Sequence, residues 1–398
     1  MSELKVVSLE ECLEKVIDYR GRTPKKLGKD WVKNGEYRAI SANNVKFDGL
    51  IREESIYRGD EELYKLWMKE EVKKGDILLT SEAPSGQAMI WDSDEKIILS
   101  QRLYALRVNK NLVDNSYLKY FIQSPLGQKS ITRNNSGSTV SGISAKTFKN
   151  IKILIPDLEN QQAISKFLLT IDQKIQINNQ INQELEAMAK TLYDYWFVQF
   201  DFPDQNGKPY KSSGGKMVYN PELKREIPEG WGVEKLSHFL TIKNGKDHKH
   251  LQDGEFAVYG SGGIMRMVTE YLYSGESILF PRKGTLNNVM YVNEKFWTVD
   301  TMFYSEVNKN NSALYVFYSV KDIDFNKLNT GTGVPSMTSS ILYDLNIIVP
   351  EEKILEQFNT IVKQNYETIK LNSIQNQELT QLRDWLLPML MNGQVKVE

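Results

Sequence analysis

Cysteine and histidine are scarce in this 398-residue chain, which has one cysteine, Cys12, and three histidines. One thiol cannot form an internal disulfide, and a single cysteine beside so few histidines is a poor zinc site. No run of 18 apolar residues is present to cross a membrane, and residues 1–5 lack the apolar core of a secretion signal. These absences predict a cytoplasmic protein with no metal site and no membrane association.

Motifs for catalysis are also missing. No Asn-Pro-Pro or Asp-Pro-Pro loop is present to hold a flipped adenine, and Asn220-Pro221 continues with Glu222. The phosphate-binding pattern Gly-x4-Gly-Lys-Ser/Thr fails because Met217 follows Lys216. The sequence therefore predicts a protein without an active site. A nuclease or methyltransferase with a diverged site, using clustered Asp and Glu to bind Mg²⁺, is the alternative.

Neither sign of charge dominates, since 50 Lys and Arg face 51 Asp and Glu for a net charge of −1. This balance excludes DNA binding through an overall positive charge but leaves room for a locally basic surface. Residues 1–156 hold 26 basic and 21 acidic residues, whereas residues 231–350 hold 11 and 12. The same balance would suit an interaction scaffold that binds no DNA.

What the chain does contain is an internal repeat. When residue n is set against residue n+194, three pairs of segments match without a gap, which indicates duplication. They are Ser136–Val140 with Thr330–Val334, Ile153–Pro156 with Ile347–Pro350, and Asn182–Leu185 with Asn376–Leu379. Upstream, Leu9 pairs with Leu236 at an offset of 227, so the first copy is longer in its middle. Two copies of one scaffold that differ in their central residues suggest two different binding specificities.

Each copy ends in a predicted long helix with a heptad seam, in which the spacing alternates between four and three residues. An Asn pair lies at the middle of each seam, and a buried Asn costs stability but specifies register. The two matched pairs predict that the helices pack on each other, rather than on separate cores. The seam residues are Ile171, Ile175, Asn178, Asn182 and Leu185 in the first helix and Ile369, Asn372, Asn376 and Leu379 in the second.

The rest of the chain mixes strand-like runs, such as 76–80 and 151–155, with short helices, such as 115–122. Residues 201–230 are rich in turn-forming residues, which predicts a connector. The fold class is therefore α/β, in tandem repeat. The predicted parts are domain 1 (residues 1–156), a central helix (157–200), the connector (201–230), domain 2 (231–350) and a C-terminal helix (351–398).

Residues 192–231 carry a specific signature, which runs from Leu192-Tyr-Asp-Tyr-Trp-Phe197 through Phe202–Tyr210 to Arg225-Glu-Ile-Pro-Glu-Gly-Trp231. It strongly resembles the central region of the specificity subunits of type I restriction-modification systems. The resemblance covers essentially the whole chain. Further landmarks are Gly21–Pro24 in the first domain and Val258–Ile264, Phe280–Thr285 and Phe296–Thr301 in the second.

The resemblance implies two target-recognition domains, each reading one half of a split double-stranded DNA target. Two long antiparallel helices would form a coiled coil, set the distance between the half-sites and dock two modification subunits. Those subunits would methylate adenine with S-adenosylmethionine, and added restriction subunits would bring ATP hydrolysis and Mg²⁺-dependent cleavage. This chain itself would bind no cofactor. Because the first domain lacks a segment like Gly260-Ser-Gly-Gly263, the target should be asymmetric.

The candidate DNA-binding residues are polar side chains of the predicted loops. Lys, Arg and loop amides hold phosphates, whereas Arg and Lys suit guanine and Asn and Gln suit adenine. A solvated or phosphate-contacting loop is favoured over a metal site at Lys246–His250. The candidates are Arg22, Lys25, Asn43, Asn44, Arg133 and Ser138 in the first domain and Lys246, His248, Arg266, Arg282, Lys283 and Thr332 in the second.

Overall fold

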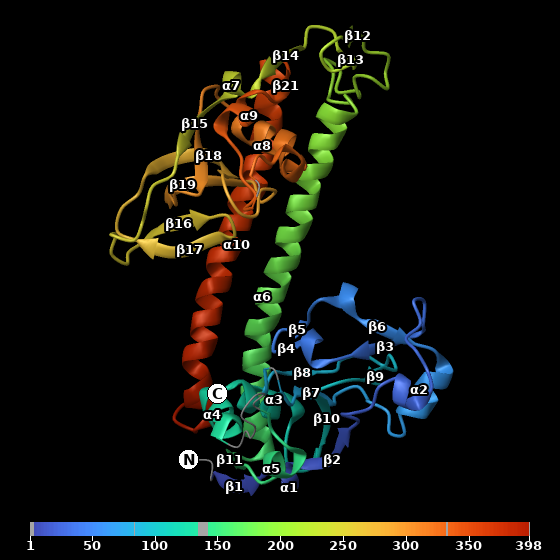
Figure 1. The fold of residues 1–398 in the computed structure, drawn as a ribbon. Coiled ribbons are helices and arrows are strands. Elements are labelled where there is room, and N and C mark those ends of the chain that lie inside the picture. The colour runs from blue at the N-terminus through green and yellow to red at the C-terminus, as the bar shows by residue number, and fades with distance from the viewer. Residues whose placement is uncertain (1–3, 83, 134–141, 332, 398) are drawn as a thin grey trace. The chain divides into compact units, whose positions relative to one another are not determined.

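The computed structural model describes residues 4–82, 84–133, 142–331 and 333–397 (Figure 1). The chain divides into two compact units: unit 1 is Met1–Asn179 with Ser373–Glu398, and unit 2 is Gln180–Asn372. Both units are α/β, as the sequence predicted. The helices α6 (Leu158–Tyr193) and α10 (Glu352–Met391) each contribute one part to each unit. No helix within the described ranges is long and apolar enough to cross a membrane.

Unit 1 is built on an antiparallel sheet of order β2-β10-β7-β8 and a smaller sheet of order β6-β3-β9, in which β3 and β9 are parallel. A pair of short strands, β1 with β11, joins the beginning of the domain to its end. Its strands are β1 (Lys5–Ser8), β2 (Leu13–Asp18), β3 (Tyr37–Ile40), β4 (Val45–Lys46), β5 (Gly49–Leu50), β6 (Tyr57–Gly59), β7 (Ile77–Thr80), β8 (Ala88–Ile90), β9 (Ile98–Leu99), β10 (Leu103–Val108) and β11 (Lys152–Ile155).

The short helices of unit 1 begin where the sequence supplies a capping side chain. Ser8 and Glu11 form a capping box at α1, and the Asp114 carboxylate accepts a hydrogen bond from Tyr117 N at 2.9 Å at the start of α3. The helices are α1 (Leu9–Cys12), α2 (Glu61–Trp67), α3 (Asn115–Gln123), α4 (Pro125–Arg133) and α5 (Ala145–Lys149), with 3-10 turns at Lys25–Leu27, Ala42–Asn44 and Glu53–Ser55.

Unit 2 contains a sheet of order β15-β20-β18-β19-β16-β17, which is antiparallel except where β16 runs parallel to β19. Its strands are β12 (Met217–Asn220), β13 (Arg225–Pro228), β14 (Gly232–Lys235), β15 (Leu240–Asn244), β16 (Phe256–Gly260), β17 (Gly263–Val268), β18 (Tyr273–Pro281), β19 (Met290–Thr298), β20 (Met302–Val307) and β21 (Asn346–Val349). Its helices are α7 (Leu236–Phe239), α8 (Ala313–Lys321) and α9 (Ser339–Tyr343), with a 3-10 turn at Phe325–Leu328.

The duplication seen in the sequence is also present in the strand pairing. β1 pairs with β11 in unit 1, and β14 pairs with β21 in unit 2. In both units a short helix follows the first of these strands, at Leu9 and at Leu236, which confirms the upstream match of the repeat. The helices α6 and α10 begin at Leu158 and Glu352, which correspond at the offset of 194.

The connector between α6 and β14 is more ordered than its turn-rich composition predicted. The α-helix ends at Tyr193 and a π-helical turn, Asp194–Val198, follows it. β12 and β13 then form a hairpin, with the Asn220 side chain accepting hydrogen bonds from the backbone N–H groups of Glu222 and Leu223 at 3.0 Å. Strands of four residues are too short to stand out against the flanking turn formers.

Within each unit the two long helices pack antiparallel. In unit 1, Asp172 contacts Arg383 and Asn178 contacts Asn376. In unit 2, Asn182 contacts Asn372 and Leu185 contacts Asn365. The residue number rises along α6 as it falls along α10, so the direction is antiparallel in each unit. The helices also join the cores, with Ile164 and Leu387 buried in unit 1 and Ala189 and Phe358 buried in unit 2. Each long helix therefore contributes buried residues to the core of each unit.

Candidate nucleic-acid interface

Loops at one edge of the unit 1 sheets form the first part of the candidate interface. Because β3 and β9 run parallel, the loops that follow them emerge at the same edge. β7 ends there too, opposite the beginning of β10. Backbone hydrogen bonds join these loops: Ser100 N to Ile40 O (2.8 Å), Ala42 N to Gln101 O (3.2 Å), Ser81 N to Arg102 O (2.9 Å) and Ile143 N to Ser81 O (2.9 Å).

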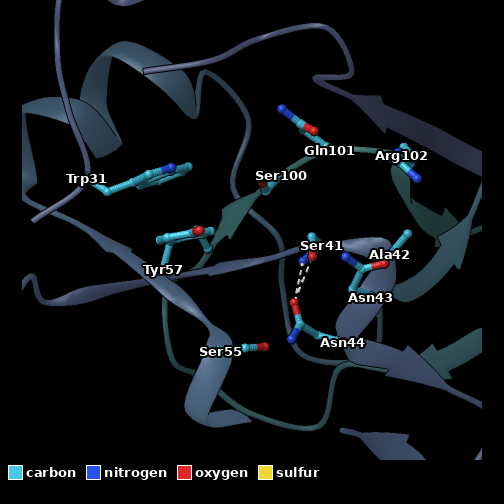
Figure 2. Close-up of a pocket in the computed structure, with 11 residues that line it drawn as sticks. Trp31, Ser41, Ala42, Asn43, Asn44, Ser55, Tyr57, Ser100, Gln101 and Arg102 are labelled. Atoms are coloured by element: carbon cyan, nitrogen blue, oxygen red, sulfur yellow. Dashed lines mark hydrogen bonds between the residues drawn. The ribbon is translucent and has the colours of Figure 1, made fainter. Parts of the chain in front are cut away.

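These loops enclose a pocket of about 300 Å³, with an aromatic side and a polar side. On the aromatic side, Trp31 and Tyr57 stack with ring centroids 5.6 Å apart and planes 11° from parallel. Figure 2 shows Asn43, Gln101 and Arg102 away from these rings, across the pocket. Exposed aromatic faces and amide or guanidinium groups are the kinds of surface that contact nucleic-acid bases.

The two adjacent asparagines of this pocket have different surroundings. Asn43 is exposed, whereas Asn44 is buried. The Asn44 side-chain oxygen accepts a hydrogen bond from Ser41 Oγ at 2.8 Å (Figure 2). The Asn44 side-chain nitrogen donates to the Ile51 and Arg52 carbonyls, both at 3.3 Å. Asn44 thus holds the loop in shape, whereas the Asn43 side chain is exposed at the pocket.

Gln101 and Arg102 were not among the residues that the sequence pointed to, although both are exposed and line the pocket. Arg102 has a left-handed backbone with φ of 59°. A non-glycine residue in this region costs about 1–2 kcal/mol, and such positions cluster at functional sites. The structure makes Ile97–Arg102 the counterpart of the second-domain landmark Phe296–Thr301, because the two segments pair in parallel with β3 and β16, a correspondence that the residue types do not show.

The other candidates of unit 1 do not line this pocket. The Arg22 guanidinium donates to the carbonyl of Trp67 at the end of α2 and lies over the Tyr19 ring, 4.5 Å from its centroid. That side chain is therefore engaged within the unit. Lys25 and Arg133 are exposed. Ser138 lies outside the described residues.

In unit 2, residues 282–285 form a loop whose backbone is held and whose basic side chains are exposed. Four backbone hydrogen bonds connect it to neighbouring segments: Arg282 N to Thr301 O (2.8 Å), Lys283 N to Thr301 O (3.2 Å), Gly284 N to Pro335 O (3.1 Å) and Met337 N to Arg282 O (2.9 Å). The Arg282 guanidinium lies 5.9 Å from the centroid of the Phe303 ring. A rigid loop that projects an Arg and a Lys is suited to an anionic or guanine-bearing ligand.

The left-handed backbone explains the glycine of this loop. Gly284 has φ of 90°, and a Cβ there would lie 2.9 Å from Ser261 Oγ in the Gly260–Gly263 turn. A second contact, from Asn288 Nδ2 to Ser261 O at 2.8 Å, holds the same turn. The glycine-rich turn and the 282–285 loop, both recognised as family landmarks, are thus neighbours.

The remaining candidates of unit 2 lie around the end of β15 and along β17. The Lys246 side chain is exposed, while its carbonyl accepts a hydrogen bond from Trp297 Nε1 at 2.9 Å. His248 is partly buried, and its Nδ1 has no hydrogen-bond partner among the described residues. Arg266 donates from Nη2 to Leu251 O and to an Asp253 oxygen, both at 2.9 Å. Thr332 lies outside the described residues.

The seam asparagines meet across the helix pair in each unit. In unit 1, Asn178 Nδ2 donates to Gln375 Oε1 and Asn376 Oδ1, both at 2.8 Å, and Asn376 Nδ2 donates to Asn179 Oδ1 at 2.8 Å. In unit 2, Asn372 Nδ2 donates to Asn182 Oδ1 at 2.9 Å. The other seam positions, Ile171, Ile175, Leu185, Ile369 and Leu379, are buried or partly buried.

An ion cluster lies beside the seam in unit 1. The Asp172 carboxylate accepts hydrogen bonds from Tyr120 Oη at 2.6 Å and Arg383 Nη1 at 2.9 Å, with Lys119 Nζ at 3.4 Å. Burial acts to raise the pKa of Asp172, but the charge of Lys119 and the donors outweigh it, so that this pKa lies below its ordinary value. The carboxylate of Asp172 thus stabilises the charges of Lys119 and Arg383 within the packed interface.

Reactive groups are few in the part of the chain that the structure describes. It contains no group of three or more His, Cys, Asp or Glu that could hold a metal ion. Cys12 is a free, buried thiol in the core of unit 1, and burial raises its pKa to about 12. A buried thiol that stays protonated is inert.

The two units share one loop framework. The bond from Ser81 N to Arg102 O in unit 1 corresponds to the one from Arg282 N to Thr301 O in unit 2. Two further bonds correspond in the same way: Ile143 N to Ser81 O with Met337 N to Arg282 O, and Ser100 N to Ile40 O with Val299 N to Tyr259 O. The backbone is therefore repeated where the exposed side chains differ.

Comparisons with known proteins agree with this duplicated architecture. The family model described as type I restriction modification DNA specificity domain matches residues 1–187 and 228–381. The MjaIX specificity subunit of Methanocaldococcus jannaschii is 29% identical over 354 residues, which is 82% of this chain and 78% of that protein. The HindI specificity subunit of Haemophilus influenzae is 24% identical over 413 residues, with 82% and 88% covered.

A solved structure shows the same fold at lower identity. The type I restriction-modification system S subunit from M. genitalium aligns with a TM-score of 0.62 over 98% of this chain and 96% of that one. Its sequence is 16% identical, so this likeness concerns the fold alone.

Proposed function

The chain belongs to the type I restriction-modification DNA specificity family, and from this premise we propose that it reads a split, asymmetric DNA target with one unit for each half-site. The observation that carries the proposal is the shared loop framework, which has the same backbone hydrogen bonds in both units but different exposed side chains. A repeated loop backbone with different exposed side chains would let the two units recognise different DNA sequences in the same way. Because the side chains differ, the two half-sites differ.

The chemistry of each loop set supports direct contact with DNA. Unit 1 offers the amides of Asn43 and Gln101 beside Arg102, whereas unit 2 offers Arg282 and Lys283. Amide side chains pair with adenine edges, and guanidinium groups pair with guanine edges or phosphates. Backbone hydrogen bonds hold these loops before any ligand binds, so little ordering is left for the moment of binding.

In this proposal the reactions belong to partner subunits. Two modification subunits dock on the chain and methylate adenine with S-adenosylmethionine, and restriction subunits joined through them use ATP and Mg²⁺ to translocate and cut DNA. This chain recognises the DNA target, binds none of these cofactors and acts in the cytoplasm. The chain recognises its target sequence through contacts to bases, because phosphate contacts carry no sequence information.

The experiment is an exchange of the second globular segment, residues 231–350, within the whole complex. Methylated adenines are mapped in the host genome, with and without this gene, to define the target. Residues 231–350 are then replaced by the corresponding segment of a relative, and the map is repeated. The half-site read by unit 2 should change while the other stays the same. A change in both half-sites, or in neither, contradicts the proposal.

A second assay addresses the alternative of a diverged nuclease or methyltransferase. The purified full chain is incubated with target DNA and Mg²⁺, and separately with S-adenosylmethionine. Under the proposal the DNA stays intact and unmethylated until modification subunits are added. Cleavage or methylation by the chain alone would favour the enzyme.

A further inference from the structure

Most arginines of unit 1 are engaged within the protein. Arg107 pairs with Glu70 and Asp76, Arg38 pairs with Glu53 and Glu95, and Arg383 pairs with Asp172. Arg20 pairs with Asp18, while Arg22 and Arg58 donate to backbone carbonyls. Among the arginines of unit 1 that the structure describes, only Arg52, Arg102 and Arg133 have a guanidinium group with no ion pair or hydrogen bond. These three are left to meet a ligand.

Of these three residues, Arg102 alone lies on the loop framework that both units share. Its carbonyl accepts the hydrogen bond from Ser81 N, as the carbonyl of Thr301 accepts the one from Arg282 N. Ser81 and Arg102 therefore correspond to Arg282 and Thr301. Each unit carries one arginine in this hydrogen-bonded pair, but on opposite members of the pair.

The charges of the neighbouring residues follow the same reversal. In unit 1, Glu82 follows Ser81 and the neutral Gln101 precedes Arg102. In unit 2, Lys283 follows Arg282 and Asp300 precedes Thr301. Each pair of loops thus contains a basic residue on one loop and a carboxylate on the other. The loop that carries the basic residue in unit 1 corresponds to the loop that carries the carboxylate in unit 2. A sequence alignment alone would set Arg102 against a threonine and Arg282 against a serine.

We propose that Arg102 is the base-reading arginine of unit 1, the functional counterpart of Arg282 in unit 2, and that it recognises guanine in the first half-site. This inference rests on the proposed function of the chain in DNA recognition. The left-handed backbone of Arg102 and the hydrogen bond at its carbonyl hold the base of the side chain in place. An arginine held in this way can form the paired hydrogen bonds to O6 and N7 of guanine, which no other base offers.

The test uses the full chain assembled with its modification subunits. Binding is measured to duplexes in which each position of the methylation-defined target is substituted in turn. For Arg102→Gly, discrimination at one guanine of one half-site should fall about 10- to 100-fold, with the other half-site unchanged. Glycine suits the left-handed backbone, so this variant removes the side chain without adding strain.

Two further variants separate base reading from charge and from backbone effects. Arg102→Lys keeps the charge but loses the forked geometry, so it should keep the salt dependence of binding and retain only part of the discrimination. Lys224 is an exposed cation with φ of 52° in the turn between β12 and β13, and Lys224→Gly is the matched control, with no change in discrimination expected. Equal weakening on every duplex, with a salt slope reduced by about one, would make Arg102 a phosphate contact and overturn the inference.

The failure of this inference is distinguishable from failure of the proposed function. If Arg282→Ala alters one position of the second half-site while Arg102→Gly alters none in the first, the units still read DNA and only the assignment of Arg102 is wrong. If the unsubstituted complex binds all duplexes equally, the proposed function itself fails.

Discussion

Asn178 of α6 donates a hydrogen bond from Nδ2 to Oδ1 of Asn376 of α10 at 2.8 Å, in a position where Asn178 is fully buried. Asn178 Oδ1 has no hydrogen-bond partner among the described residues. A buried amide that is only partly satisfied adds little stability, but it penalises other registers of the helix pair. This contact therefore selects one alignment of the helices.

Replacing one partner of this contact should cost more than replacing both. For Asn178→Leu we expect a loss of about 1–3 kcal/mol, because Asn376 Oδ1, on a partly buried side chain, loses its donor. The double variant Asn178→Leu, Asn376→Leu should recover most of that loss, since two apolar groups can pack where two amides were. Denaturant unfolding of the full chain, followed by circular dichroism, measures both. A double variant less stable than the single one contradicts this reading.

The Asp172 cluster predicts a larger effect. Asp172→Asn removes the counter-charge of Lys119 and the least exposed counter-charge of Arg383, and both cations are nearly buried, so we expect a loss of about 3–5 kcal/mol at neutral pH. Asp384 contacts the same Arg383 from an exposed position, and Asp384→Asn is a matched control that should cost less than about 1 kcal/mol. Similar losses in the two variants would show that burial of the cluster is not what matters.

The pH dependence of the same cluster follows from the lowered pKa of Asp172. A carboxyl whose pKa is lower in the folded state adds stability above its unfolded-state pKa and loses it as the pH falls through the folded-state pKa. The difference in unfolding free energy between the original chain and Asp172→Asn should therefore shrink in acid. Unfolding measured over a pH series below neutrality tests this; a constant difference would contradict it.

The 282–285 loop predicts how binding responds to salt. If Lys283 neutralises a phosphate, Lys283→Ala should weaken the assembled complex on all target variants and reduce the slope of log K against log salt by about one. Lys309 is a cation of the same unit outside the shared loops, and Lys309→Ala is the control, with the slope unchanged. A flat salt response of the unsubstituted complex would instead favour a scaffold that does not bind DNA.

Cys12 predicts a slow reaction with thiol reagents. Its pKa of about 12 and its burial keep the thiol protonated and covered near pH 8, so alkylation of the folded chain should be at least about 100-fold slower than in denaturant. Mass spectrometry of the alkylated protein over time measures this. Equal rates in the two conditions would show that Cys12 is accessible in the folded state.

Much of the fold was predictable because it depends on periodic patterns. The four-three spacing predicted both long helices, and Ile153–Pro156 with its repeat at Ile347–Pro350 marked the last strand of each domain. Local spacing reports which face of an element is buried, and that is enough to identify helices and strands. The hairpin at 217–228 was missed because its strands are too short to show a period.

The loops were less predictable, since exposed polar residues carry no periodic signal. Asn43 and Asn44 are adjacent and chemically identical, yet one is exposed and the other holds its loop by hydrogen bonds. Arg102 was overlooked because its counterpart in the repeat is Thr301, and the correspondence with Arg282 exists only through a hydrogen bond across two loops.

By itself, then, the sequence determined the duplication, the helical seams and the family, because each of these is written in residue spacing and local motifs. Only the tertiary structure decided which side chains are free to contact DNA. That choice depends on hydrogen bonds and packing between residues far apart in the chain, such as Ser81 with Arg102, and no local pattern encodes those contacts.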